Sequence, residues 1–114
     1  MLEELEKIFK ALSDKNRIRI IKMLQKKSLC VCEIQAVLKL AVSTVSKHLS
    51  ILREAGFISD WKEGKWINYR INPNPGQAVS NALLFVQMQI EEDDTIKKDR
   101  KMTCCVDRNI LCCK

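Results

Sequence analysis

The sequence of 114 residues lacks the features of three common classes of protein. No apolar stretch approaches the roughly 20 residues that a membrane-spanning helix needs, so we expect no membrane span. His48 is the only histidine and has no serine or aspartate partner at motif spacing, which excludes a hydrolytic triad. The first residues are acidic where an export signal would be basic and then apolar, so we expect a cytoplasmic protein.

The amount and the placement of charge favour a single basic domain. The length suits one compact domain, and 46% hydrophobic with 30% charged residues can build a core. The net charge is +6, and residues 7–70 hold 14 lysines and arginines against five acidic residues. Residues 91–114 hold six residues of each sign. We therefore expect an anionic partner, such as nucleic acid, to bind the first of these stretches.

Six cysteines fall in three close pairs, namely Cys30 with Cys32, Cys104 with Cys105, and Cys112 with Cys113. Without an export signal we expect reduced thiols, because glutathione and thioredoxin oppose disulfides in the cytosol. Paired intracellular thiols favour metal, metalloid or redox chemistry, and a place at the start of a helix favours the thiolate. Burial in the core is the alternative for the first pair, and a ligand-free end of the chain is the alternative for the others.

Apolar spacing predicts two helices at the start of the chain. Residues 2–12 repeat apolar side chains at helical spacing, with glutamates in the first turn. Ser13 or Asp14 can cap a second helix that runs to about residue 26. The basic side chains of this second helix that we expect to face mostly outward are Arg17, Arg19 and Lys22.

Two further helices are expected on either side of a tight turn. A short third helix starts near the first cysteine pair, and Ser43 is expected to cap a fourth that ends at Ala55. Gly56 tolerates the left-handed conformation that ends such a helix. At about 100° per residue the fourth helix buries its valine and leucines and turns small polar side chains outward. Those outward residues are Ser43, Thr44, Ser46, Lys47 and Ser50.

Aromatic and branched residues on either side of a polar tip predict a β-hairpin over residues 57–71. A two-residue turn at Glu63 and Gly64 would pair the two tryptophans across the strands. Lys62 and Lys65 would then flank an exposed, positive tip.

After the hairpin, Asn74 and Pro75 predict the start of a fifth helix that runs to about residue 90. Its apolar stripe is wider than one side of a small domain can bury, so we expect it to meet a second copy of the chain. Residues 91–101 are highly charged and precede the four late cysteines, as in a mobile tail. The chain therefore divides into a domain of residues 1–90 and a charged, cysteine-rich tail of residues 91–114.

Two helices joined by a tight turn and followed by a basic hairpin have the order of a winged helix-turn-helix. The predicted fold is mainly α with a small β-hairpin. Short hydroxyl groups and one lysine can approach base edges and phosphates in a DNA major groove. The DNA-binding residues that we assign are Ser43, Thr44, Ser46, Lys47, Ser50, Lys62 and Lys65. His48, at the border of the buried face, is assigned a packing or hydrogen-bonding role.

Four stretches, in this order, resemble the ArsR/SmtB family of metal-sensing transcriptional repressors: residues 11–14, 30–33, 45–56 and 64–70. The resemblance covers about residues 2–90. It implies a winged-helix homodimer whose first and last helices form the interface, and whose DNA affinity falls when a metal or metalloid binds. The Cys-Val-Cys-Glu sequence of residues 30–33 is similar to the arsenic-responsive members in particular.

The resemblance implies that thiolates of Cys30 and Cys32 bind trivalent arsenic or antimony. These ions usually take three thiolates, and Gln35 occupies the place where arsenic-responsive members often have a third cysteine. The late cysteines, a small cellular thiol or a hydroxide could supply the third ligand. The candidate metal ligands are therefore Cys30, Cys32, Cys104, Cys105, Cys112 and Cys113.

These observations together predict a repressor that binds operator DNA as a homodimer when free of inducer. Arsenite or antimonite is the expected inducer, and no cofactor is required for DNA binding. We expect no catalytic residues and no enzymatic activity. The nearer alternative is the same fold with a response to cadmium, lead or thiol oxidation. The farther alternative is a thiol enzyme or a metal carrier, although the chain has no Cys-x-x-Cys motif.

Overall fold

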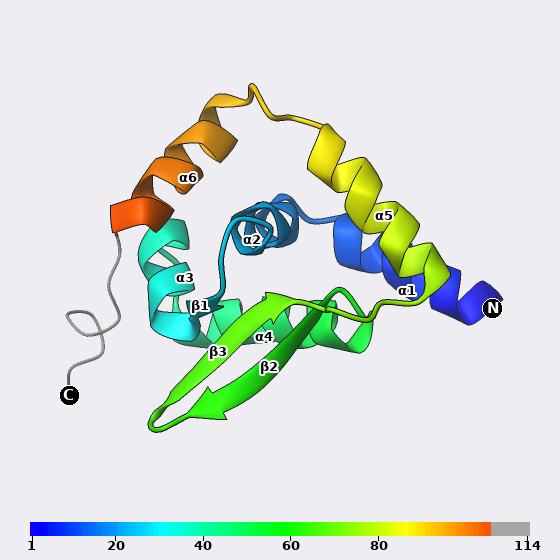
Figure 1. Cartoon of the computed structure of the whole chain (residues 1–114), viewed down its shortest axis with the longest axis horizontal. Coiled ribbons are helices and arrows are strands. Elements are labelled where there is room, and N and C mark those ends of the chain that lie inside the picture. The colour runs from blue at the N-terminus through cyan, green and yellow to red at the C-terminus, as the bar shows by residue number, and fades with distance from the viewer. Residues whose placement is uncertain (106–114) are drawn as a thin grey trace.

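A computed structural model describes residues 1–105 of the chain, with the backbone alone at Cys105. The elements, in chain order, are α1 (Leu2–Leu12), α2 (Lys15–Leu24), β1 (Leu29–Cys30), α3 (Val31–Leu38), α4 (Val42–Glu54), β2 (Ile58–Glu63), β3 (Trp66–Ile71), α5 (Gln77–Met88) and α6 (Asp94–Cys105). Figure 1 shows α2 near the centre, with α3 and α6 to one side and α1 and α5 to the other. No helix in this part of the chain is long and apolar enough to cross a membrane.

The arrangement is a winged helix-turn-helix, as the sequence predicts. Helices α3 and α4 pack together across a short turn, and the hairpin of β2 and β3 follows α4 (Figure 1). Strand β1 was not predicted from the sequence; its residues Leu29 and Cys30 pair with Tyr69 and Asn68 of β3. All three strands are antiparallel, in the order β1-β3-β2. A strand of two residues is too short to leave a periodic pattern in the sequence.

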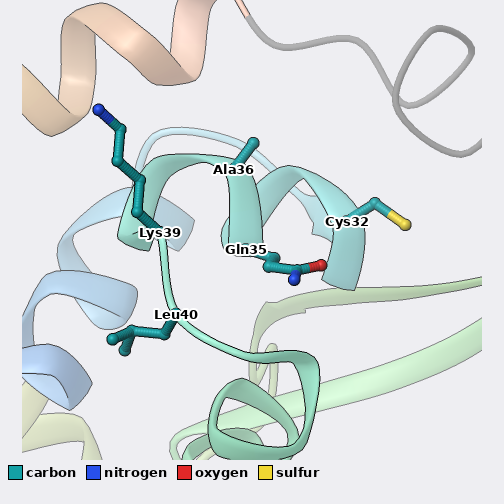
Figure 2. Close-up of a pocket in the computed structure, with 5 residues that line it drawn as sticks. All are labelled: Cys32, Gln35, Ala36, Lys39 and Leu40. Carbon is teal, nitrogen blue, oxygen red and sulfur yellow. The ribbon is translucent and has the colours of Figure 1, made fainter.

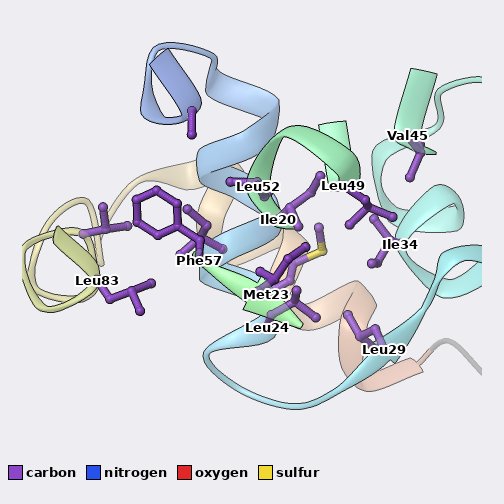
Figure 3. Packing of buried hydrophobic residues seen from close by; sticks show 14 of the residues in the cluster. Ile20, Met23, Leu24, Leu29, Ile34, Val45, Leu49, Leu52, Phe57 and Leu83 are labelled. Carbon is purple, nitrogen blue, oxygen red and sulfur yellow. The ribbon is translucent and has the colours of Figure 1, made fainter. Parts of the chain in front are cut away.

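The core forms around α2. Ile20, Ile21 and Leu24 are buried, as predicted, and Figure 3 shows α2 residues beside leucines of α4. Phe57, directly after α4, is fully buried in the same cluster. Because this one cluster includes residues of both α3 and α4, α2 holds the two helices of the helix-turn-helix against each other.

Asp14 caps α2, as the sequence allows. Its Oδ1 accepts from the backbone N–H groups of Asn16, at 2.8 Å, and Arg17, at 3.4 Å. Burial by itself would raise the pKa of Asp14, but these two amide donors, together with the nearby His48 and Arg17, lower it below the ordinary value. The carboxylate is therefore ionised at neutral pH.

Two other predicted caps are wrong. Helix α4 begins at Val42 after an extended Ala41, so Ser43 lies within the first turn rather than before it. Helix α5 begins at Gln77 after Gly76, and Asn74 does not cap it. The backbone N–H of Asn74 instead donates to the side chain of Asn72, which also donates to the carbonyl oxygen of Gly56. These bonds fix a turn where the sequence suggested a helix start.

The hairpin register differs by one residue from the prediction. Glu63 pairs with Trp66 and Trp61 pairs with Asn68, so the two tryptophans do not face each other. The turn lies at Gly64 and Lys65, and only Gly64 has a positive φ, of 61°. A positive φ at the first central residue alone is typical of a two-residue hairpin turn with glycine in that position.

Lys22 is buried, whereas the sequence analysis expected it to face mostly outward. Only 1% of the residue is exposed. Its Nζ donates to the backbone carbonyl oxygens of Val86 at 3.1 Å, Gln87 at 3.1 Å and Gln89 at 2.8 Å, and it pairs with the carboxylate of Glu91. The last carbonyl groups of a helix have no partners within the helix, and a cation there also suits the helix dipole. Lys22 therefore joins α2 to the end of α5.

The mobile tail expected after residue 90 is wrong for residues 94–105, which form α6. Helix α6 packs against α2 and α3. Ile96, Asp99 and Thr103 are buried, and Arg19 of α2 donates to both carboxylate oxygens of Asp99, at 2.8 and 2.9 Å. Few apolar residues mark this helix, so its sequence looks like a solvated segment. The division of the chain at residue 90 stays a prediction.

We expect Asp99→Ala to destabilise the protein by about 2 kcal/mol, because it leaves the partly buried Arg19 guanidinium without its acceptor. Urea unfolding followed by circular dichroism measures this. The matched control is Glu6→Ala, which removes an exposed ion pair with Lys10 and should cost less than about 0.5 kcal/mol. Equal unfolding midpoints for the two variants would contradict the assignment.

Candidate nucleic-acid interface and thiol sites

The outward face of α4 is polar and accessible. Val45, Leu49 and Leu52 anchor the helix in the core and are all buried. The five residues that the sequence analysis assigned to DNA on this helix are all exposed on the side away from the core: Ser43, Thr44, Ser46, Lys47 and Ser50. The face therefore offers hydroxyl groups and one ammonium group on a helix that the core holds rigidly.

The tip of the hairpin carries two exposed ammonium groups. Lys62 and Lys65 lie at or beside the turn, and the Lys65 Nζ lies 5.2 Å from the centre of the Trp66 ring. Farther along the hairpin, the Arg70 guanidinium stacks over the Trp61 ring at 5.3 Å. These cation–π contacts order the basic side chains without neutralising them.

Arg53 links α4 to the hairpin. Its guanidinium donates to the Asp60 carboxylate of β2 at 2.9 Å. Because this bond joins the exposed helix to the first strand, the hairpin and α4 are held in a fixed relation.

Cys30 lies where the sheet meets α3. As the last residue of β1 it pairs with Asn68 of β3, and as the residue before α3 it closes a capping box with Glu33. The Cys30 backbone N–H donates to Glu33 Oε1 at 2.9 Å, and its sulfur accepts from the Glu33 N–H. A displacement of Cys30 would therefore move both the hairpin and α3, the helix that packs on α4.

Burial makes the Cys30 thiol a weaker acid rather than a stronger one. The side chain is fully buried, and this desolvation raises its pKa above the ordinary value. The Glu33 amide acts in the opposite direction, while the Glu33 carboxylate adds to the rise. The prediction of a more acidic thiol at this helix start is wrong for Cys30, because desolvation is the largest effect on its pKa.

Cys32 lies in the first turn of α3, is partly buried and is disulfide-bonded. Cys30 and Cys104 are free thiols. The expectation of six reduced cysteines is therefore wrong for Cys32. Cys32 also lines a cavity of about 400 Å³ on α3, with Gln35, Ala36, Lys39 and Leu40. Figure 2 shows Ala36 and Lys39 pointing toward α6, while the Cys32 sulfur points away from the helix near its start.

The remaining candidate ligands lie on α6 or outside the described residues. Cys104 is an exposed free thiol on α6. The side chain of Cys105, together with Cys112 and Cys113, lies outside the part that the structure describes. Within the described side chains, no three histidine, cysteine, aspartate or glutamate residues lie close enough to hold a metal ion. This part of the chain therefore does not supply a three-thiolate site.

Helices α1 and α5 each expose several large apolar side chains. The two helices contact each other and run side by side at one end of the molecule (Figure 1). The exposed fraction reaches 65% for Phe9, 66% for Phe85 and 71% for Met88. The other exposed apolar residues on these two helices are Leu2, Leu5 and Leu84. Such a patch is typical of a protein–protein interface.

One cavity beside α4 was not found from the sequence. It has a volume of about 520 Å³ and adjoins the polar face of the helix. Its lining residues are Asp14, Arg17, Ser43, Thr44, Lys47, His48 and Ile51. His48 is half-buried and its Nδ1 lies 3.1 Å from a guanidinium nitrogen of Arg17, 31 residues earlier in the chain. Helical periodicity within α4 carries no signal for a contact with another helix.

The chain is similar to known bacterial and archaeal regulators. The arsR family of bacterial regulatory proteins matches residues 14–60. The chain is 40% identical over 68 residues to the arsenical resistance operon repressor of Escherichia coli (strain K12). The aligned region covers 59% of this chain but only 58% of that protein. It is 44% identical over 70 residues to an HTH-type transcriptional regulator of Methanocaldococcus jannaschii. Here the aligned region covers 60% of this chain and 79% of that protein.

A solved structure shows the same architecture. The homodimeric winged helix-turn-helix DNA-binding domain Mb0332 of Mycobacterium bovis, a possible ArsR-family transcriptional regulator, has a TM-score of 0.65 at 27% identity. The similarity covers 75% of this chain and 77% of that one. The resemblance first seen in four short stretches is thus confirmed by sequence relatives and by fold, and the chain belongs to the ArsR family of bacterial regulatory proteins.

Proposed function

We propose that this protein is a homodimeric transcriptional repressor that binds operator DNA and releases it when its cysteines react with a thiophilic ion. The observation that carries the proposal is the position of Cys30, which joins the hairpin to the helix that packs on α4. The family favours regulation of transcription over catalysis. We accordingly assign no catalytic residue.

DNA binding uses the two accessible basic and polar surfaces described above. The outward face of α4 enters the major groove, where its hydroxyl groups approach base edges and Lys47 binds a phosphate. The Lys62 and Lys65 ammonium groups bind phosphates beside it. Arg53 keeps the two surfaces in register through its bond to Asp60.

We expect the double variant Lys62→Ala/Lys65→Ala to bind all duplexes more weakly, because it removes phosphate contacts rather than base contacts. The slope of log K against log salt concentration should flatten by about 2, or about 1 per lost contact. Fluorescence anisotropy with a labelled promoter fragment measures both effects. Lys97→Ala/Lys98→Ala on α6 removes equal charge and should leave the slope unchanged. An unchanged slope in the hairpin variant would remove the hairpin from the interface.

The apolar patch on α1 and α5 forms the dimer interface in this proposal. A dimer places two α4 helices on one duplex and matches a palindromic operator. The homodimeric state of the Mycobacterium bovis domain supports this assignment.

We expect Leu84→Glu/Phe85→Glu to be a folded monomer, because both side chains are exposed in a single chain, at 57% and 66%. Introducing charge into the interface opposes its burial. Analytical ultracentrifugation measures the mass, and circular dichroism checks the fold. Ile67→Glu, at another exposed apolar position, is the control and should remain dimeric. A dimeric double variant would place the interface elsewhere.

Thiol chemistry at Cys30 disturbs both DNA-contacting elements. A thiol must lose its proton to become a ligand, and the buried Cys30 resists this loss. An ion that binds the Cys30 sulfur replaces the hydrogen bond that this sulfur accepts from the Glu33 N–H, and the capping box opens. The start of α3 and the pairing with β3 then change together. A coupling of about 1 to 3 kcal/mol would weaken DNA binding about 5- to 150-fold.

Trivalent arsenic or antimony is the inducer that we favour. Soft ions select thiolate ligands, and the relative in Escherichia coli is an arsenical resistance repressor. Cys32 must be reduced before it can contribute a thiolate. Since Gln35 supplies no sulfur, the third ligand comes from a late cysteine, a small thiol or a hydroxide.

We expect Cys30→Ser/Cys32→Ser to bind operator DNA normally but to lose its release by arsenite. Serine can replace the Cys30 sulfur as a helix cap, so the fold is retained. Anisotropy titration of the reduced protein with arsenite measures release. Ser28→Ala, at an exposed position two residues before Cys30, is the control and should still release. Release that survives in the double variant would assign the response to the late cysteines.

Thiol oxidation is a second candidate signal, favoured by the disulfide at Cys32. The reduced dimer would then bind DNA and an oxidant would release it without any ion. Cadmium and lead belong in the same titration series, because they also select thiolates. Release by the oxidant alone, lost in Cys32→Ser, would favour this second candidate over arsenite.

A further inference from the structure

The cavity between the start of α2 and the outward face of α4 has the composition of an anion site. Arg17 and Lys47 contribute positive charge, and Ser43 and Thr44 contribute hydroxyl groups. Asp14 is the one acidic lining residue. Its carboxylate accepts from two backbone N–H groups at the start of α2 and lies 3.9 Å from Nη1 of Arg17, so Lys47 is the lining cation without an acidic partner in the cavity. The cavity borders the face of α4 that we assign to DNA, so a DNA phosphate can reach it.

The Arg17 guanidinium is occupied by contacts within the protein. Its Nε donates to the carbonyl oxygen of Ala11 at 2.8 Å, and its Nη2 donates to that of Lys10 at 3.0 Å. Its Nη1 lies 3.1 Å from Nδ1 of His48. Arg17 is thus fixed on the end of α1, with one nitrogen directed at the imidazole ring.

This contact determines which nitrogen of His48 carries the proton. Arginine has only donors and stays protonated in proteins, so His48 Nδ1 must be the acceptor. A neutral imidazole with an acceptor at Nδ1 has its proton on Nε2. The Nε2–H is then the one donor that the ring can offer to a ligand. The groups that face this ring around the cavity are Asp14, Arg17 and Lys47.

We propose that Arg17 is a positioning residue that holds His48 as a neutral Nε2–H donor, and that His48, Lys47 and Thr44 bind one backbone phosphate of duplex DNA in this cavity. The proposal rests on the proposed function and adds to it a phosphate contact outside the major-groove face. A phosphate oxygen accepts from the imidazole N–H and the hydroxyl group, and the Lys47 ammonium balances its charge. Arg17 does not touch the phosphate, and its charge is offset by the Asp14 carboxylate 3.9 Å away.

A neutral donor and a cation leave different signatures in a salt titration. Loss of a lysine contact to phosphate lowers the salt slope by about 1, because fewer counterions are released. Loss of a neutral N–H donor lowers the affinity but leaves the slope unchanged. We therefore expect His48→Ala to bind operator DNA about tenfold more weakly at an unchanged slope, and Lys47→Ala to flatten the slope.

The role of Arg17 is tested by Arg17→Lys, which keeps the charge and removes the planar fork. We expect it to lose as much affinity as His48→Ala, and the double variant to be no weaker than either single variant. His48→Gln, which keeps a donor, should recover part of the affinity. Nitrogen NMR of the only histidine in the chain should show the Nδ1 signal move in Arg17→Lys, and thermal unfolding checks that each variant is folded.

The phosphate is identified with duplexes that carry one neutral methylphosphonate at a time. One substitution should weaken the wild type about tenfold more than it weakens His48→Ala, which keeps only the Lys47 and Thr44 contacts to that phosphate. Inorganic phosphate at matched ionic strength should not displace the duplex. Wild-type affinity for His48→Ala, or additive losses in the double variant, would overturn the inference. Displacement by inorganic phosphate would mean a general anion site. A wild type that binds no duplex would instead overturn the proposed function.

Discussion

The structure depends on one residue that belongs to two elements at once. Cys30 ends β1, where it pairs with the hairpin, and its side chain and backbone close the capping box that starts α3. Both roles require an extended backbone at this residue, and it has one, with φ −87° and ψ 168°. The hairpin and the helix-turn-helix therefore cannot move independently near this point. A chemical change at a buried sulfur can thus reach surfaces that it does not touch.

Helix α2 gives this junction its rigid support. Its apolar residues belong to the same buried cluster as those of α3 and α4, and its polar residues hold the elements of the second half of the chain. Lys22 binds the end of α5, and Arg19 binds Asp99 of α6. Glu91, between these two helices, pairs with both Lys22 and Arg100, and those donors lower its pKa to about 2. The proposed dimer helix and the cysteine-bearing helix are therefore both attached to α2.

The sequence predicted the elements that have strong periodicity and missed those defined by long-range contacts. Helices α1 and α4 and the existence of the hairpin follow from apolar spacing and from glycine at Gly56. The buried Lys22 and helix α6 depend on partners some 65 to 80 residues away, which a local pattern cannot show. The exposure of the assigned α4 residues was predictable from helical geometry. The high pKa of Cys30 was not, because burial outweighed its place at a helix start.

The hairpin register has an optical consequence. Both tryptophans of the chain lie in the hairpin, and the one-residue shift gives them different surroundings. Trp61 is exposed beneath the Arg70 guanidinium, whereas Trp66 is only partly exposed beside Lys65. Tryptophan fluorescence of this protein therefore comes from the β2–β3 hairpin alone. A change in the emission intensity on mixing with duplex DNA would report binding of the hairpin in real time, with no attached dye and no contribution from the core.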